Sequence, residues 1–167
     1  MLILFIVLGL IFGSFINVLI HRLPLNESIA FPSSYCPNCK TNINWFNNIP
    51  LISFLLLKGK SNCCNNNISI RYPVVELLSS ILWIWSYFYI DGLINQIFFI
   101  IIVSCLLTIF FTDFNHFYIP FELNLIIFLS ALVNLLISNI ENIQYHFFSM
   151  MVLSIYFLVL LLLRSYL

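Results

Sequence analysis

Charged residues are scarce in this chain of 167 residues, where Asp, Glu, Lys and Arg together make up 7%. A soluble globular domain has about 25% charged residues, so this chain lacks the polar groups needed to cover a water-facing surface. Its formal net charge is zero, which gives no electrostatic basis for binding nucleic acid. Hydrophobic residues reach 62%, and this composition predicts an integral membrane protein.

The apolar residues fall into five segments, at residues 2–21, 74–90, 94–112, 119–138 and 146–163. An α-helix needs about 20 apolar residues to cross a bilayer. The first segment has no basic region before it and no small-residue cleavage site after it, so we interpret it as a retained helix and not as a signal peptide. We therefore expect an all-α integral membrane protein with about five transmembrane helices.

Residues 22–73 form a polar loop between the first two apolar segments. The loop holds five of the six basic residues, four of the five cysteines and five of the six prolines. With five spans, the sixth basic residue, Arg164, lies on the same side of the membrane as this loop. The other side receives the N-terminus, Asp91 and Glu141, and no Lys or Arg. Because positive residues concentrate on the cytoplasmic side, we expect the N-terminus outside and the loop and C-terminus in the cytoplasm.

Four cysteines in the loop have the spacing of a metal site. Cys36 and Cys39 form a Cys-x2-Cys knuckle, and Cys63 and Cys64 follow at a short distance along the chain. Two such turns typically supply four thiolates to a structural Zn²⁺ ion, and the reducing cytosol disfavours disulfides. The alternative is a metal-free loop, because adjacent cysteines rarely direct both sulfurs at one ion. Cys105, inside an apolar segment, is interpreted as a packed hydrophobic residue.

Two carboxylates lie at the predicted cytoplasmic edge of the membrane. Glu76 begins the second apolar segment, and Asp113 closes the third. A carboxylate at membrane depth is a functional candidate, whereas near the interface it is equally a solvated boundary residue. Asp113 opens a short polar turn that contains His116 and ends at Pro120, which starts the next helix.

Several motifs occur in a fixed order along residues 9–122. They are GSFINVLIHRLP at 13–24, CPNC at 36–39, NIPLISF at 48–54, ISIRYPVVEL at 68–77, and Asp113 followed seven residues later by Pro120. In order and spacing these motifs resemble the bacterial type IV prepilin peptidases.

The resemblance implies an aspartic endopeptidase of the bacterial inner membrane. Such enzymes remove the leader from type IV prepilins or type II secretion pseudopilins at the cytoplasmic face, then methylate the new N-terminus with S-adenosylmethionine. Asp113 would be one of two catalytic carboxylates that share acid and base roles. Glu76 would bind the methyl-transfer cofactor. The zinc ligands would be three or four of the loop cysteines: Cys36, Cys39, Cys64 and, as an optional fourth, Cys63.

The chain departs from the family pattern at three places. The family's second catalytic aspartate lies in a Gly-x-Gly-Asp motif, and this chain has no glycine after Gly92. Ser61 stands where the third cysteine is expected, and Phe121 stands where an aspartate often follows the proline. A single carboxyl cannot divide two roles, so we expect no peptidase activity from these residues alone.

Three hypotheses follow for the whole chain. In the first, residues 1–21, 22–73 and 74–167 are the first helix, the cysteine loop and a C-terminally truncated peptidase core. In the second, the chain is a non-catalytic remnant or membrane scaffold that retains the zinc loop. The third, an unrelated small membrane protein, requires all the motif matches to be accidental.

Overall fold

The computed structural model describes residues 1–31, 33–36 and 38–137. In this part of the chain the secondary structure is helical, with two isolated β-bridges and no strand. The long helices are α1 (Leu2–Arg22), α3 (Arg71–Tyr89), α4 (Leu93–His116) and α5 (Phe121–Ile137). The loop between α1 and α3 contains three short helices, η1 (Leu23–Leu25), η2 (Trp45–Asn48) and α2 (Ile52–Leu56).

Among the described residues, two helical stretches are long and apolar enough to cross a bilayer. They are Leu2–Leu25, with mean hydropathy 2.7, and Leu93–His116, with mean hydropathy 2.5. Phe121–Asn134 is apolar but shorter. These helices fit an all-α membrane protein, while the expected number of five spans stays a prediction. The expected fifth segment, 146–163, lies outside the described residues.

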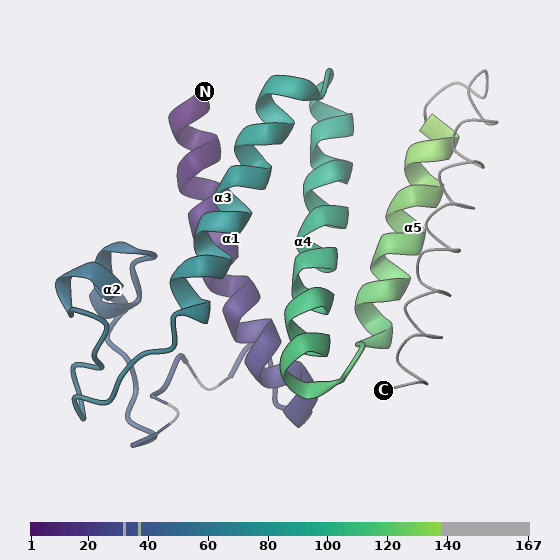
Figure 1. Cartoon of the computed structure of the whole chain (residues 1–167). Coiled ribbons are helices and arrows are strands. Elements are labelled where there is room, and N and C mark those ends of the chain that lie inside the picture. The colour runs from purple at the N-terminus through teal and green to yellow at the C-terminus, as the bar shows by residue number, and fades with distance from the viewer. Residues whose placement is uncertain (32, 37, 138–167) are drawn as a thin grey trace. The chain divides into compact units, whose positions relative to one another are not determined.

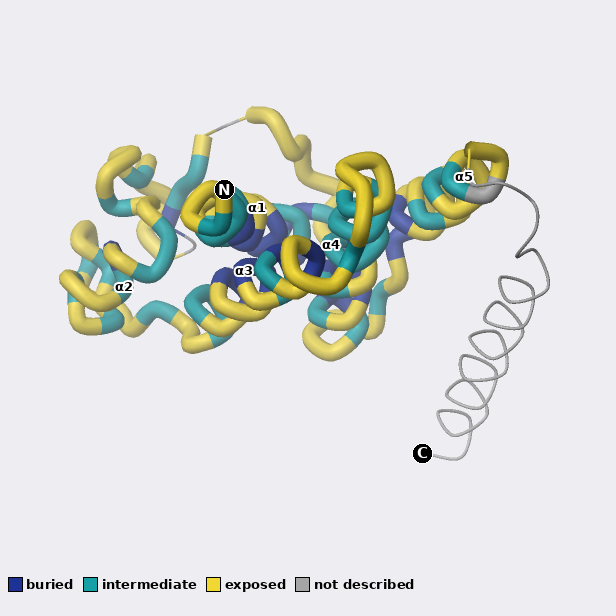
Figure 2. The backbone as a smooth tube through the Cα atoms, turned by 90° about the horizontal axis from the view of Figure 1, so that it is seen from above, coloured by how far each residue is buried: buried dark blue, intermediate teal, exposed yellow. Residues whose placement is uncertain are grey.

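Helices α1, α3 and α4 pack against one another, with the N-terminus and the α3–α4 turn at one end and the α4–α5 turn at the other (Figure 1). Their buried residues face each other, and their outer faces are largely exposed (Figure 2). One core cluster joins Ile16 and Ile20 of α1 to Val75 of α3. A second joins Cys105 and Ile109 to Leu123, so Cys105 is a packed hydrophobic residue as predicted.

The most extensive helix contact is between α1 and α3, and two glycines allow it. A Cβ added to Gly9 would lie 2.7 Å from the Ser80 Cα atom, and one added to Gly13 would lie 2.6 Å from the Glu76 Cα atom. Small residues four positions apart allow helix backbones to approach in this way. The Ser80 hydroxyl also donates a hydrogen bond across the interface, to the Ile6 carbonyl at 3.3 Å.

Two helix ends differ from the sequence expectations by more than two residues. The expected segment 74–90 begins earlier, at Arg71. The expected turn that opens at Asp113 begins later, because α4 continues to His116. The Asn115 side chain donates to the Phe111 carbonyl at 2.6 Å, and the helix ends only where Phe117 adopts a left-handed conformation with φ 51°. Asp113 therefore lies in the last turn of α4 and not in a loop.

Candidate functional site

The first cysteine knuckle is a tight turn closed by backbone hydrogen bonds. The Cys36 carbonyl accepts from the Lys40 N–H at 2.9 Å, and the Cys36 N–H donates to the Thr41 carbonyl at 2.9 Å. Lys40 has a positive φ of 59°, and a β-bridge pairs Tyr35 with Asn42 outside the turn. These bonds hold Cys36 and residues 38–41 in a compact arrangement that presents the side chains of Cys36 and Cys39 together.

A second turn repeats this geometry around Ser61. The Ser61 carbonyl accepts from the Asn65 N–H at 2.9 Å, and the Ser61 N–H donates to the Asn66 carbonyl at 2.8 Å. Asn65 has a positive φ of 55°, and a β-bridge pairs Lys60 with Asn67. The loop therefore contains two turns of the same construction, and both carry cysteines.

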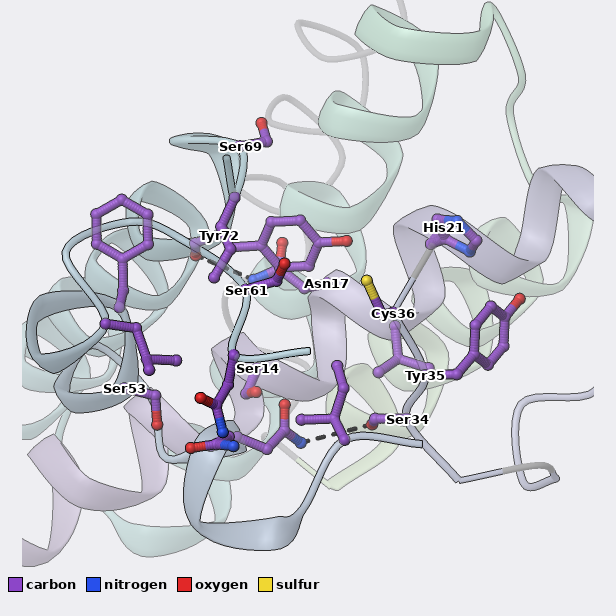
Figure 3. Close-up of a pocket in the computed structure, with 18 of the residues that line it drawn as sticks. Ser14, Asn17, His21, Ser34, Tyr35, Cys36, Ser53, Ser61, Ser69 and Tyr72 are labelled. Atoms are coloured by element: carbon purple, nitrogen blue, oxygen red, sulfur yellow. Dashed lines mark hydrogen bonds between the residues drawn. The ribbon is translucent and has the colours of Figure 1, made fainter. Parts of the chain in front are cut away.

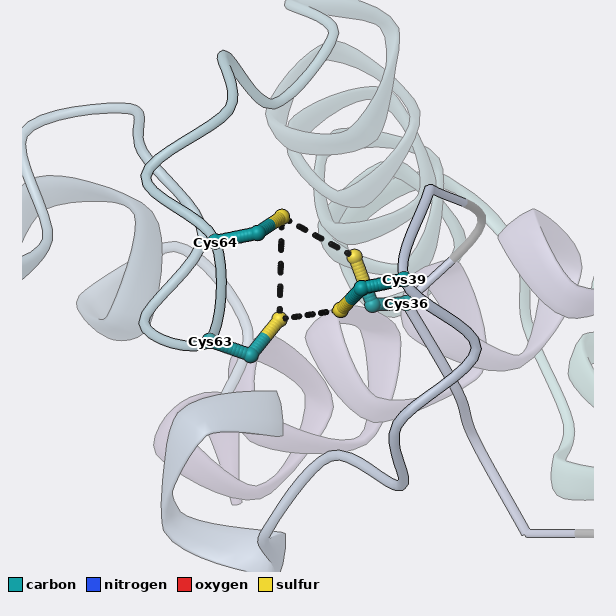
Figure 4. Close-up of side chains that lie close together, drawn as sticks. All are labelled: Cys36, Cys39, Cys63 and Cys64. Carbon is teal, nitrogen blue, oxygen red and sulfur yellow. Dashed lines mark hydrogen bonds between the residues drawn. The ribbon is translucent and has the colours of Figure 1, made fainter.

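The two turns bring four sulfur atoms together (Figure 4). The Sγ atoms of Cys36, Cys39, Cys63 and Cys64 all lie within 4.8 Å of one another. The Cys36–Cys64 separation is 3.8 Å, the Cys63–Cys64 separation is 3.9 Å, and the Cys39–Cys63 separation is 3.1 Å. All four are free thiols. Cys63 and Cys64 both contribute a sulfur to the cluster, although adjacent cysteines rarely direct both sulfurs at one ion.

These distances suit a tetrahedral metal ion. A Zn²⁺ ion with Zn–S bonds of about 2.3 Å places its thiolates about 3.8 Å apart. Two of the three separations above are within about 0.1 Å of that value, whereas the Cys39 and Cys63 sulfurs would have to separate slightly. The donor set is therefore the one that a closed structural zinc site uses.

The thiols of the cluster are not equivalent as acids. A hydrogen bond with the Thr41 hydroxyl and, second, the contact with the Cys63 thiol lower the pKa of Cys39 to about 6. Thr41 also lowers the pKa of Cys63, but the neighbouring thiols and desolvation outweigh it and raise that pKa to about 11. A hydrogen bond from Ser61 lowers the pKa of Cys64. Without a metal, the cluster therefore carries a thiolate at Cys39 and a protonated thiol at Cys63 at neutral pH.

Beside the cluster lies a cavity of about 520 Å³ between the loop and the ends of α1 and α3 (Figure 3). Helix α1 contributes Ser14 and Asn17, the loop contributes Cys36 and Ser61, and α3 contributes Tyr72. Many of its other lining residues are asparagines. The loop side of the cavity is therefore rich in neutral amide groups, and the other side is formed by side chains of α1 and α3.

Glu76 is buried at the edge of this cavity, where it holds the loop against the helices. Its carboxylate accepts from the Leu51 N–H at 2.8 Å and from the Ser14 side chain. Leu51 has φ 58° and ψ −45°, and the Ile52 N–H donates to the Pro50 carbonyl at 2.6 Å. This is a γ-turn with its central residue at positive φ, a rare and strained conformation.

Arg22 is a second anchor of the loop, and its contacts were not predicted from the sequence. Its guanidinium is buried and donates to the carbonyls of Ser28, Ile29 and Ser33 at 2.9, 3.1 and 3.3 Å. It also lies 5.6 Å from the centre of the Tyr35 ring. A basic residue directly after an apolar helix was the available signal, but its carbonyl partners depend on the path of the loop.

The structure brings some of the predicted site residues together and not others. The four cysteines form one cluster, and Glu76 and Cys36 line the same cavity. Asp113 is absent from the residues that line this cavity, although Asn115, two positions later, is among them. The participation of Ser14, Asn17 and Leu51 was not predicted from the sequence.

Comparisons with known proteins point to one family. The family model described as the bacterial peptidase A24 N-terminal domain matches residues 7–90. A prepilin leader peptidase/N-methyltransferase of Klebsiella pneumoniae is 51% identical over 46% of this chain and 36% of its own length. Proteins of the same name from Myxococcus xanthus and Vibrio cholerae are 40% and 35% identical, over 70% and 79% of this chain.

The chain spans only part of these relatives. The matched regions cover 35% of the Myxococcus xanthus protein and 55% of the Vibrio cholerae protein. No solved structure matches the chain significantly.

Proposed function

The chain belongs to the family of bacterial type IV prepilin peptidases, and we propose that it serves leader cleavage and N-methylation of type IV prepilins or type II secretion pseudopilins. The observation that carries this proposal is the identity of 35–40% over more than two thirds of the chain with proteins named prepilin leader peptidase/N-methyltransferase. It is supported by the cysteine cluster and the adjoining cavity, which give the matched region a built site.

For the peptidase step, we assign Asp113 as one of two cooperating carboxyl groups. In such a pair one carboxylate takes a proton from the attacking water, and the other, protonated, carboxyl donates to the leaving amine. The 167 residues contain no Gly-x-Gly-Asp sequence, and we propose that the second carboxyl is the one that the family carries in that motif. Asp113 lies in the last turn of α4, where a helix side chain is held more rigidly than one in a loop.

For the loop, we propose a structural zinc ion held by Cys36, Cys39, Cys63 and Cys64. When bound, the ion would supply a tetrahedral centre that ties the two turns together. Four protein thiolates complete its coordination, so no position remains for water or substrate. Its contribution is therefore to fix the loop that forms one wall of the cavity.

For the methyl-transfer step, we propose S-adenosylmethionine as the methyl donor, with Glu76 at its site. Glu76 lines the cavity, and its hydrogen bond to Leu51 sets the position of the loop wall. Its part would be to position the loop that closes over the donor.

We propose that the protein lies in the bacterial inner membrane with the cysteine loop in the cytoplasm. The distribution of Lys and Arg supports this orientation. The α1–α3 loop and the C-terminal end of α4 lie toward the same end of the helices (Figure 1), so Asp113 and the loop would face the same side of the membrane.

A non-catalytic scaffold that retains the zinc loop is the second candidate. The cysteine cluster is built from residues 36–64 and does not involve Asp113, so it would persist without a peptidase centre. The two candidates differ in whether Asp113 matters for prepilin processing.

The test is a cleavage assay on a fusion. We expect a polypeptide of these 167 residues to leave a prepilin uncut, and a fusion to the Gly-x-Gly-Asp region of a relative to cleave it. Asp113→Asn should abolish cleavage by the fusion, because a cooperating catalytic unit fails when one member is lost. Asp91→Asn is the matched control, since Asp91 is exposed in the α3–α4 turn at the other end of the helices.

Two results would contradict the proposal. Cleavage by the 167-residue polypeptide would refute the need for a second carboxyl, and full cleavage by the Asp113→Asn fusion would refute the role of Asp113. An inactive fusion that still binds zinc would favour the scaffold.

A further inference from the structure

Exposed apolar side chains cover the outer surface of η2 and α2 in the loop. This apolar face consists of Trp45, Phe46, Ile49, Ile52, Leu55 and Leu56, of which Trp45, Leu55 and Leu56 are 80%, 73% and 77% exposed. The face lies outside the two helical stretches that are long and apolar enough to cross a bilayer. Single exposed apolar residues are normal, whereas a group of them marks an interaction surface. The apolar face therefore needs a partner of its own.

Helix α2 turns its apolar side outward, which is the opposite of a helix in a soluble protein. Ile52, Leu55 and Leu56 are spaced i, i+3 and i+4, so they share one side of the helix, and this is the exposed side. The polar residue Ser53 is buried instead, and its hydroxyl donates to the Phe46 carbonyl at 2.9 Å. This bond ties α2 to η2, so both short helices present apolar side chains to the outside.

Glu76 holds α2 at the level expected for a membrane interface. Its carboxylate accepts from the N–H of Leu51, directly before α2, at 2.8 Å. Glu76 lies five positions after Arg71, the first residue of α3, which is about 7.5 Å along the helix axis. A cation at the end of a membrane helix lies at headgroup level, and an interfacial helix buries its apolar face about 5–10 Å into the boundary. In both views α2 lies beside the α1–α3 pair (Figures 1 and 2), so its outer side would meet lipid.

The charge around the apolar face is of one sign. Residues 28–75 include four basic residues and no Asp or Glu. Two of the four, Lys58 and Lys60, come just after α2, and both are exposed. A Lys near an anionic bilayer surface strengthens attachment roughly fivefold. Tryptophan, present in the face as Trp45, is enriched at membrane interfaces. Apolar and aromatic side chains bordered by lysines are typical of a segment that lies in the plane of the interface.

We propose that the apolar face of η2 and α2 docks on the anionic lipid surface of the membrane, with Lys58 and Lys60 at the headgroups. This interaction goes beyond the proposed function, because it requires only that the long apolar helices span the bilayer. Docking would hold the loop, and with it the cysteine cluster and the cavity, against the membrane.

Fluorescence quenching in vesicles of phosphatidylcholine and phosphatidylglycerol tests the docking on the full, zinc-loaded chain. The Trp83→Phe, Trp85→Phe variant keeps Trp45 as its one tryptophan. Phosphatidylcholine brominated in its acyl chains should quench most of the Trp45 emission, and acrylamide in the water should quench little of it. The matched control adds Trp45→Phe and Ala30→Trp, since Ala30 is an exposed residue of the same loop outside the apolar face. In this control the pattern should be reversed.

The two lysines provide a second arm of the test. Lys58→Gln together with Lys60→Gln should lose most of the lipid quenching of Trp45 that phosphatidylglycerol adds over phosphatidylcholine alone. Zinc content and circular dichroism would confirm that each variant folds. Equal lipid quenching with and without phosphatidylglycerol would overturn the anionic surface as the partner.

Three further outcomes would overturn the docking itself. The first is equal lipid quenching of Trp45 and of the control tryptophan at position 30. The second is Trp45 shielded from both quenchers and exposed to acrylamide on dilution in lipid, which would identify a second copy of the chain as the partner. The third is Trp45 open to acrylamide until a prepilin is added, which would identify the substrate as the partner.

Discussion

Ser61 occupies in the second turn of the loop the position that Cys36 occupies in the first. Each residue donates its N–H to the carbonyl five positions later and accepts at its carbonyl from the N–H four positions later. In each turn a cysteine follows three positions on, Cys39 in the first and Cys64 in the second. The Ser61 hydroxyl lies 3.1 Å from the Cys64 sulfur. Cys63 therefore supplies the fourth sulfur from a position with no counterpart in the first turn.

This relationship predicts that the fourth ligand can be moved. In a Ser61→Cys, Cys63→Ser double variant, both turns would carry Cys-x2-Cys, and we expect zinc affinity equal to or tighter than that of the unsubstituted chain. Competition with a chromophoric chelator would measure the affinity. The single variant Cys36→Ser is the control and should lose more zinc than Cys63→Ser, because Cys36 is buried and belongs to the regular knuckle. A double variant that binds no zinc would refute the equivalence of the two turns.

Zinc binding should release a proton from Cys63 but none from Cys39. Thiolates are the ligands, so a thiol that is protonated before binding must lose its proton. At pH 7.5 Cys39, with a pKa of about 6, is already ionised, whereas Cys63, with a pKa of about 11, is protonated. Calorimetry in buffers of different ionisation enthalpy should show about one proton fewer released by Cys63→Ser than by the unsubstituted chain. Affinity should fall as the pH is lowered toward 6, since protons then compete at Cys39. Equal proton release by both chains would contradict these pKa directions.

Gly13→Ala should destabilise the helix packing. The new Cβ would lie 2.6 Å from the Glu76 Cα and 3.1 Å from the Ser79 Cβ, so the two helices would have to separate. We expect a loss of about 1–3 kcal/mol in the free energy of unfolding, as for an overpacked core. Unfolding in mixed detergent micelles, followed by circular dichroism, would measure it. Ile11→Ala on the exposed face of α1 is the control and should have a small effect. Unchanged stability of Gly13→Ala would show that the helices can adjust.

Glu76→Leu should loosen the loop around Leu51 without unfolding the protein. The substitution removes the acceptor that holds the Leu51 N–H at 2.8 Å, and the strained γ-turn then loses its support. Hydrogen–deuterium exchange should become roughly tenfold faster or more in peptides that contain Leu51, with zinc content unchanged. Glu27→Leu, which removes an exposed bond to Tyr35 at 2.6 Å, is the matched control. Unaltered exchange at Leu51 would mean that Glu76 does not hold the turn.

The proposed orientation predicts which thiols an impermeant maleimide reaches in intact cells. An Asp91→Cys variant should be labelled from outside, because the α3–α4 turn is expected there. The unsubstituted chain should be labelled only after the membrane is permeabilised and zinc is chelated, through the exposed residues Cys39 and Cys63. Labelling of these two cysteines in intact cells would reverse the assignment.

The helices were predictable from the sequence alone because a long apolar run is a local property. The expected segments 2–21 and 94–112 correspond to α1 (Leu2–Arg22) and α4 (Leu93–His116), with errors of a few residues at the ends. The larger difference is at the end of α4, where Asp113 lies in a helix and not in the expected turn. It arose because the Asn115 side chain, a polar residue typical of turns, bonds back to the Phe111 carbonyl and extends α4.

The sequence by itself also determined the zinc-type donor set, since Cys36-x2-Cys39 is a local pattern and two further cysteines follow it. Only the tertiary structure decided that Cys63 joins them, because the contact between Cys39 and Cys63 depends on how two turns 24 residues apart meet. The same holds for the hydrogen bond between Glu76 and Leu51, and for the one that Asn17 donates to the Tyr72 carbonyl. Each is set by the approach of the loop to the α1–α3 pair, a long-range relation that no local pattern of residues encodes.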